Sequence, residues 1–181
     1  MPALDPPTHP ITSFNGGDTG EWQVVAQRTV TGTPMPSFAR LDIGEAAPAP
    51  VWLARGFNSN LRYTTASERR DLTAHAAPPD RGDRCAVLIP MSKSPIWWAM
   101  AQDERLQVYA RSNHMRIGMD VLPAVFRRLY HGRDLGEAFD FLTWFTFAPE
   151  AAPEFDAMLG RLRASEEWQF VTHECEIRLR R

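Results

Sequence analysis

Cysteine is scarce in this sequence, and the short motifs of several large enzyme classes are missing from it. Its 181 residues include two cysteines, Cys85 and Cys175, and neither stands in a CxxC or CxxH motif. We therefore expect two small buried side chains and no thiolate metal site. The sequence also lacks a GxGxxG, a Walker loop, a GxSxG and an HExxH motif. Nothing in it indicates nucleotide binding or acyl transfer.

Neither a strong charge nor a long apolar run is present. The chain has 20 lysines and arginines against 22 aspartates and glutamates, a net charge of -2. Such a balance provides no electrostatic attraction for nucleic acid or an anionic membrane. No apolar run is long enough to span a bilayer, and the first residues lack the basic and apolar regions of a secretory signal. We expect a cytoplasmic protein without a nucleic-acid or membrane partner.

Apolar and aromatic residues, in contrast, are plentiful. Hydrophobic residues make up 44% of the chain, with 6 tryptophans and 10 phenylalanines, enough to build a core and line a large apolar cavity. Residues 1–20 are rich in proline, glycine and threonine and predict a mobile tail. Alternating apolar residues predict strands at 21–31 and 51–57, and a capping-box motif predicts a short helix over 66–74.

A linker rich in proline and charge near residue 82 divides the chain into a reduced first half, residues 1–82, and a second half, residues 83–181. The second half has a clear order of predicted elements, which are strand, helix, strand, strand, helix and strand. They are expected at 85–91, 95–122, 126–131, 139–147, 150–164 and 167–179. This βαββαβ order predicts an α+β protein with a ferredoxin-like antiparallel sheet and both helices on one face. The other face has to be covered by the first half, a second subunit or a ligand.

His114 is the first candidate for a metal ligand. In a helix it shares an apolar stripe with Ile117 and Val121, and Gly118 leaves a patch without a side chain one turn above the imidazole. A lone histidine on such a stripe is more often a core residue than a haem ligand. Glu167 falls among the inward-facing positions of the last predicted strand and favours a ligand role for His114. A carboxylate beside the far nitrogen of a ligating imidazole fixes its tautomer. A solvated glutamate at the start of a strand is the alternative.

Two cations are candidate contacts for an anion. Arg127 stands on a mostly apolar strand, where a buried charge is costly unless it has a partner or holds an anion. Lys93 comes one helical turn before Trp97, and a cation in that place can hold a carboxylate at the mouth of an apolar pocket. A surface lysine beside a core tryptophan explains the same spacing equally well.

Several long segments resemble the chlorite dismutase family of haem b proteins. They are RGFNSNLRYTT at 55–65, IPMSKSPIWWAMAQDERL at 89–106, SNHMRIGMDVLPAVFRRLYHGRDLGEAFDFLTWFTFAPE at 112–150 and ASEEWQFVTHECEIRLRR at 164–181. The resemblance covers roughly residues 50–181, and the chain is similar to the short lineage of that family whose members form homodimers. It implies two ferredoxin-like halves whose sheets form a barrel enclosing the haem, with helices outside and the first half truncated.

Residue by residue, the resemblance implies a site for haem b, iron protoporphyrin IX. His114 matches the proximal iron ligand, Glu167 the carboxylate bonded to it, and Arg127 the charged residue on the distal side of the ring. The region that holds the haem propionates is matched by Tyr63 and Lys93, with Asn60 and Trp97 nearby.

The implied reaction converts chlorite to chloride and dioxygen, and Arg127 retains the chlorine oxyanion between its two steps. Three other functions stay open on the same scaffold. They are a haem peroxidase, a coproheme decarboxylase and a non-catalytic haem carrier or sensor. The coproheme decarboxylases of this family lack the distal arginine, so Arg127 is the residue that separates chlorite conversion from coproheme decarboxylation.

Overall fold

The computed structural model describes residues 10–59, 66–67, 70 and 82–181. The strands of the first half are β1 (Ile11–Gly17), β2 (Trp22–Thr31), β3 (Arg40–Gly44) and β4 (Trp52–Asn58). Those of the second half are β5 (Cys85–Lys93), β6 (Val125–His131), β7 (Phe141–Phe147) and β8 (Val171–Arg180). The helices are α2 (Pro95–Ala99), α3 (Gln102–Arg111), α4 (His114–Met119) and α5 (Ala152–Arg163), with the 3-10 turns η1 (Arg133–Leu135), η2 (Pro149–Ala151) and η3 (Glu166–Phe170).

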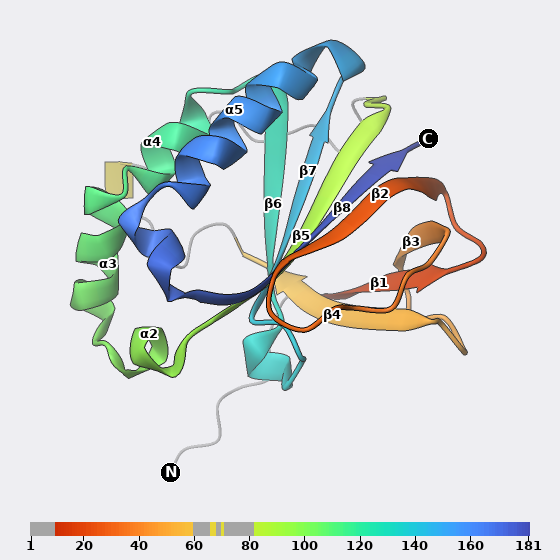
Figure 1. Ribbon diagram of the computed structural model, residues 1–181, viewed down its shortest axis with the longest axis horizontal. Helices are drawn as coiled ribbons and strands as arrows, with labels where there is room; N and C mark the ends of the chain where they lie inside the picture. Colours follow the sequence, from red (N-terminus) through yellow and green to blue (C-terminus); the bar gives the residue numbers. More distant parts are fainter. Residues whose placement is uncertain (1–9, 60–65, 68–69, 71–81) are drawn as a thin grey trace.

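The strands close into one antiparallel barrel in the order β1-β3-β2-β8-β5-β7-β6-β4. Each half contributes four neighbouring strands in the same relative order, β4-β1-β3-β2 from the first and β8-β5-β7-β6 from the second. The halves join where β2 pairs with β8 and where β4 pairs with β6. The helices gather on one side of the barrel, outside the second-half strands, and β1 to β4 project on the other side (Figure 1).

The interior of the barrel is filled by side chains from both halves. On β5, for example, Ala86 and Leu88 point inward while Val87 and Ile89 point outward, as the period of two in a strand requires. The inward-facing cluster contains large aromatic residues and leaves the interior as a packed core. Its buried members are Phe14, Trp22, Phe38, Leu41, Trp52, Ala54, Ala86, Leu88, Tyr130, Phe139, Leu142, Trp144, Cys175, Ile177 and Leu179.

A second core lies between the outer face of the second-half strands and the helices. Its largest part is the apolar stripe of α5, which packs on outward-facing residues of β5 and β7. The helices in this layer begin at local signals in the sequence. The Ser94 hydroxyl accepts a hydrogen bond from the Trp97 amide at 3.3 Å, with Pro95 in the first turn of α2. The Glu104 carboxylate accepts one from the Ala101 amide at the start of α3 at 2.7 Å.

Most predicted elements of the second half are present within a few residues, with the helical region 95–122 divided into α2, α3 and α4. The final strand differs, because residues 166–170 form the turn η3 and β8 begins only at Val171. The predicted helix over 66–74 falls mostly outside the described residues. Among the residues described, no helix is long and apolar enough to cross a membrane.

The predicted mobile tail over residues 1–20 is wrong for residues 11–17, which form β1. This strand pairs with β3 on one side and β4 on the other, so its backbone is satisfied despite a composition poor in strand formers. Phe14 is fully buried, and the Asn15 side chain bonds to Glu45 and Ala47 in the loop after β3. The tail prediction failed because it weighed composition and ignored pairing with distant strands.

The closed barrel that the resemblance implies is present, but its interior is not where the predicted site residues meet. The interior is occupied by the aromatic cluster, whereas the cavity that contains the predicted residues lies outside the barrel, under the helices. The face of the second-half sheet that the helices leave open is covered by the strands of the first half. This is one of the three alternatives that the sequence analysis named, the others being a second subunit and a ligand.

Candidate functional site

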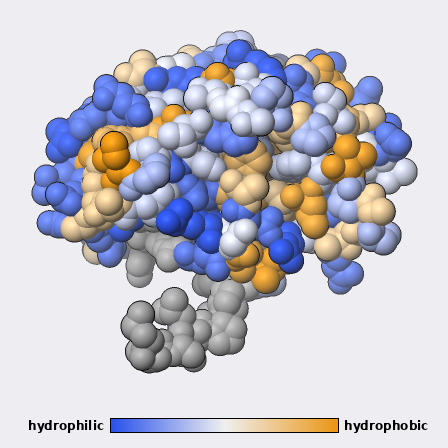
Figure 2. Space-filling view, turned by 60° about the horizontal axis from the view of Figure 1, so that its bottom comes forward, coloured by the Kyte–Doolittle hydropathy of each residue, from blue (hydrophilic) through white to orange (hydrophobic). Residues whose placement is uncertain are grey.

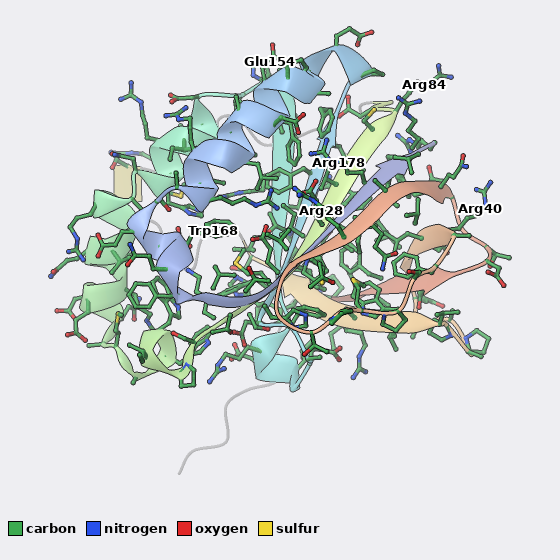
Figure 3. The ribbon with its side chains drawn as sticks, in the orientation of Figure 1. Arg28, Arg40, Arg84, Glu154, Trp168 and Arg178 are labelled. Carbon is green, nitrogen blue, oxygen red and sulfur yellow. The ribbon has the colours of Figure 1, made fainter. Side chains whose placement is uncertain are left out.

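A mainly apolar cavity lies on the outer face of β5, β6 and β7, beneath the helical layer. Its volume is about 50 Å³. Its walls are Ile89, Met91, Lys93, Tyr109, His114, Arg127, Leu129, Phe141, Thr143, Phe145, Leu159, Leu162, Glu167 and Trp168. Figure 3 shows Trp168 on the helical side of the barrel. Four of the residues predicted from the sequence, His114, Glu167, Arg127 and Lys93, therefore meet in one place.

His114 is the first residue of α4, and both of its ring nitrogens have partners. Nδ1 lies 2.5 Å from a Glu167 carboxylate oxygen, and Nε2 lies 3.0 Å from Nη1 of Arg127. A guanidinium can only donate, so Nε2 must accept and the ring proton belongs on Nδ1, where it is donated to Glu167. This is the tautomer in which Nε2 presents a lone pair to a cation. The Tyr109 ring supports the imidazole edge-on, with centroids 5.1 Å apart.

Glu167 is almost fully buried in η3, with 2% of its surface exposed. Its amide donates to the Ser112 hydroxyl at 2.9 Å, which fixes the turn against the end of α3. Its second carboxylate oxygen accepts from Nζ of Lys93 at 2.5 Å. Burial alone would raise the pKa of this carboxyl, but its contacts with His114 and Lys93, hydrogen bonds from both included, outweigh burial and hold the pKa at about 2. The group is therefore an anion wedged between two nitrogen donors.

The structure places Lys93 differently from the prediction. Its ammonium group is buried against Glu167 and lies 3.5 Å from the centre of the Trp97 ring, with the Tyr109 hydroxyl at 3.4 Å. Burial lowers the pKa of Lys93, and the Glu167 carboxylate opposes that effect. The predicted proximity to Trp97 is confirmed, but the carboxylate that Lys93 holds belongs to the protein. The sequence signal that was overlooked is the period of two along β5. It places Lys93 on the same outward face as Ile89 and Met91, and therefore in the cavity wall.

Arg127 extends from β6 across the cavity. Its guanidinium contacts His114 and lies beside Gly118 on α4, where an added Cβ would meet only Nη1 of Arg127, at 3.8 Å. The predicted bare patch next to the imidazole is therefore present. Burial lowers the pKa of Arg127, while the charges of Glu167 and Tyr109 act in the opposite direction. It remains a cation, because the ordinary pKa of arginine is far above neutrality.

Two of the remaining predicted residues, Asn60 and Tyr63, lie outside the described residues. Trp97 is fully buried behind Lys93 and does not line the cavity. Tyr109 was missed by the sequence analysis, although it lines the cavity and contacts both His114 and Lys93. Its position on α3 gave no distinctive spacing from His114, because the short break before α4 changes the helical phase.

The residues present fit an iron porphyrin chemically. Nε2 of His114 faces a cation, its other nitrogen is backed by a carboxylate, and the surrounding walls are apolar with a bare patch at Gly118. The guanidinium of Arg127, 3.0 Å from Nε2, stands where a metal ion would be bound. The cavity has a volume of about 50 Å³ as it stands. To admit a porphyrin ring, the long side chain of Arg127 would have to rotate away from the imidazole and enlarge the cavity.

Comparison with known proteins gives a clear structural match. A crystal structure of dimeric chlorite dismutases from Nitrobacter winogradskyi matches with a TM-score of 0.88 and 43% identity, covering 94% of this chain and 99% of that one. A mutant chlorite dismutase from Candidatus Nitrospira defluvii in complex with cyanide matches at 0.65 and 14% identity, covering 94% and 90%. The latter supports the fold alone. No protein-family model and no curated protein matches the sequence.

Proposed function

Because the chain belongs to the chlorite dismutase family, we propose that it is a haem b enzyme that converts chlorite to chloride and dioxygen. The observation that carries the proposal is the line of contacts from Lys93 through Glu167 and His114 to Arg127. It combines a histidine whose Nδ1 is bonded to a carboxylate with an arginine cation in one mainly apolar cavity. Arg127 also favours chlorite conversion over coproheme decarboxylation, since the decarboxylases of the family lack it.

His114 would hold the iron through Nε2, and Glu167 would keep the ring proton on Nδ1. Bound haem supplies the redox chemistry that breaks the oxygen–chlorine bond. Lys93 balances the negative charge of Glu167. The carboxylate bonded to His114 is therefore not a buried charge without a partner. Tyr109 would limit rotation of the imidazole through its edge-on contact.

Arg127 would bind the anionic substrate. The reaction turns one chlorite into one chloride and one dioxygen, so it consumes neither a proton nor an external electron. The protein must admit a small anion and retain the chlorine oxyanion until both oxygens have joined. A guanidinium with several donors in a mainly apolar cavity suits both tasks, because a charge contact is stronger where water is excluded.

No proton transfer has to be catalysed on the substrate side, and arginine is a poor general base. Among the described residues that line this cavity, the one carboxylate is Glu167, which is already bonded to His114 and Lys93. Peroxide cleavage requires a proton to move between oxygens. We therefore expect weak peroxidase activity beside a rapid reaction with chlorite.

Oxygen evolution from chlorite by the haem-loaded protein tests the proposal. The wild type should release one dioxygen per chlorite, and Arg127→Ala should lose about a hundredfold in rate, the scale of removing one charged transition-state contact. Arg127→Lys should recover part of the rate. Arg84→Ala, an exposed arginine at the far end of the barrel (Figure 3), is the control. Haem binding without oxygen release would favour a carrier, and an unchanged rate in Arg127→Ala would refute the role of Arg127.

We also propose that the protein is a cytoplasmic homodimer, with residue 82 near the boundary between its halves. The dimer is supported by the dimeric protein from Nitrobacter winogradskyi. It is further supported by apolar side chains on the first half, which are Ile11, Val25, Val30, Val51 and Leu53. Figure 2 has apolar surface on the right, the side of these strands. Light scattering after gel filtration should give a mass near twice that of the chain, and the mass of a single chain would contradict the dimer.

A further inference from the structure

The turn η3 is five residues long, Glu166–Phe170, and carries the carboxylate that is bonded to His114. Turns of the 3-10 kind are short and have poorer hydrogen-bond geometry than an α-helix, so their position depends on contacts with neighbouring elements. Two such contacts bracket Glu167. One comes from the end of α3, and the other comes from β8.

The first contact is made by Ser112, at the end of α3. Its hydroxyl accepts a hydrogen bond from the Glu167 amide at 2.9 Å, and the serine is buried. Asn113 follows in the left-handed conformation, with φ 51°, and leads the chain into α4, of which His114 is the first residue. The segments that carry Glu167 and His114 are therefore bonded twice, once through the Ser112 hydroxyl and once between the two side chains.

The second contact is made by Glu174 on β8, which is fully buried. One of its carboxylate oxygens accepts a hydrogen bond from the indole nitrogen of Trp168 at 2.8 Å, and Trp168 directly follows Glu167 in η3. The other oxygen accepts two hydrogen bonds from Arg163, the last residue of α5. Because both oxygens are engaged, the carboxylate holds the indole at a fixed place in the cavity wall.

Charge compensation alone does not explain Glu174. Glu176, two positions along β8, shares Arg163 with it and has further arginine partners. A buried ion pair is a weak source of stability, because desolvation offsets much of the attraction. Among the described contacts, Glu174 differs from Glu176 by its bond to η3. This difference points to a role in placing the turn.

We propose that Ser112 and Glu174 are positioning residues for the bond between Glu167 and His114. The turn cannot rotate without breaking the contact at the Glu167 amide or the one at Trp168. The carboxylate therefore stays 2.5 Å from Nδ1 of His114. A close carboxylate makes the imidazole a stronger electron donor to a metal. The inference rests on the proposed function where iron is measured, whereas the bond itself can be tested without haem.

The first experiment follows the Nδ1 proton of His114 by NMR in the haem-free full chain, prepared with isotope-labelled histidine. A short hydrogen bond to a carboxylate moves this resonance far downfield, so a longer one moves it back upfield. Glu174→Gln should cause an upfield shift, because an amino group replaces one of its two acceptor oxygens and would face a donor, either Trp168 or Arg163. Ser112→Ala should also cause one, and Ser112→Thr, which keeps the hydroxyl, should not.

Glu176→Gln is the matched control. It removes a buried carboxylate from the same strand and from the same Arg163, but the partners of Glu176 in the described structure are arginines rather than residues of η3. This variant should lower the free energy of unfolding and leave the Nδ1 resonance at its wild-type position. Trp168→Phe is the converse, because it removes the indole N–H and keeps Glu174 and its arginine. It should reproduce the shift of Glu174→Gln, and it repeats the test should that variant fold poorly.

The second experiment measures the iron–histidine stretching frequency of the ferrous haem protein by resonance Raman spectroscopy. A weaker bond from the carboxylate lowers this frequency, so Ser112→Ala and Glu174→Gln should shift it in the same direction as Glu167→Gln and by less. In a Glu167→Gln background neither substitution should add a further shift, because both act through the bond that this background has already lost. An undiminished shift in that background would contradict action through Glu167.

A substitution of Ser112 or Glu174 that leaves the Nδ1 resonance unchanged overturns the role of that residue. A shift in Glu176→Gln as large as that in Glu174→Gln would overturn the role of Glu174 as well, since it would reflect a general loss of charge on β8. Failure of the wild type to bind haem would instead refute the proposed function. The NMR comparison in the haem-free chain would still decide whether the two residues place Glu167.

Discussion

The two halves of the barrel have the same strand order but different duties. The first half has no helix between residues 10 and 59, all of which the structure describes, and its strands show apolar side chains to solvent. The second half buries the outer face of its strands under α3, α4 and α5 and forms the site there. A shared strand order therefore determines the barrel, whereas the helical layer on one half determines where a ligand can bind.

The two seams between the halves also differ. β2 and β8 pair over most of their length, from Gln23 with Arg180 to Thr31 with Glu174. Within the described residues, β4 and β6 pair at two positions, Phe57 with His131 and Asn58 with Tyr130, and the Ser59 amide donates to the Leu129 carbonyl just beyond them. The long seam is reinforced on the outside by a cluster of arginines and glutamates, in which Arg28 of β2 reaches Glu176 of β8 (Figure 3). We expect the short seam to open first.

Removing an aromatic side chain from each half should give the largest effect. Phe14 in the barrel interior and Phe155 on the inner face of α5 are both fully buried. Either substitution by alanine should lower the free energy of unfolding by about 3–5 kcal/mol, measured by urea denaturation. Phe155→Ala should in addition weaken haem binding, because α5 forms a wall of the site, and Phe14→Ala should not. Equal losses of haem affinity would contradict the division of duties between the halves.

Glu167→Gln tests the chemistry of the second half without removing volume. Loss of the carboxylate leaves Nδ1 of His114 and the ammonium of Lys93 without their anion. Haem affinity or chlorite turnover should fall about ten- to hundredfold, as is usual for a partner of a metal-bound histidine. The position and width of the ferric Soret band should change as well. Glu166→Gln, whose side chain is bonded to Arg111 at the surface, should leave that spectrum unaltered.

The pH dependence of unfolding should reveal the long seam. Burial alone would raise the pKa of Glu176, but hydrogen bonds from Arg28, Arg163 and Arg178 hold it at about 2. Because its ordinary value is 4.5, the stabilisation is complete above that pH and is lost as pH falls toward 2. Glu176→Gln should remove a contribution on the order of 2 kcal/mol near neutrality and flatten the acid limb of the stability curve. Glu154→Gln, at an exposed site on α5, should not change the curve's shape.

The smallest effect is expected at the short seam. Arg55 of β4 bonds to Glu137 at 2.7 Å, but its side chain is 47% exposed. Arg55→Met should therefore cost only about 0.5 kcal/mol in denaturant titrations. Hydrogen exchange should nevertheless be faster at Phe57 and Asn58 than along β2 in the wild type. Equal protection of the two seams would show that pairing length does not govern their opening.

The sequence identified the second half well because its elements have strong local signals. The apolar runs of β5 and β7, the stripe of α5 and the spacing from His114 to Arg127 can all be read without tertiary information. The first half depends on pairing between distant strands, and β1 was missed for that reason. The sequence analysis paired Glu167 with His114, as the structure does, but placed it on the final strand. It lies in η3 instead, and a five-residue 3-10 turn leaves no periodicity in the sequence.

Contacts between side chains were the least predictable part of the site. Lys93 and Trp97 were expected together, but whether the ammonium faces a ligand or Glu167 depends on where η3 lies.

The alternation of side chains across the barrel wall has a practical use for directed evolution. On β5, β6 and β7 the odd-numbered residues face the site and the even-numbered ones face the filled interior. A library at Leu129 and Thr143, which line the cavity and lie outside the second core, would vary ligand recognition. Odd positions such as Val87 and Phe147 belong to that core, so changes there would lower stability as well. A library at even positions such as Ala86 and Leu88 would vary the packing of the barrel interior and leave the cavity lining unchanged.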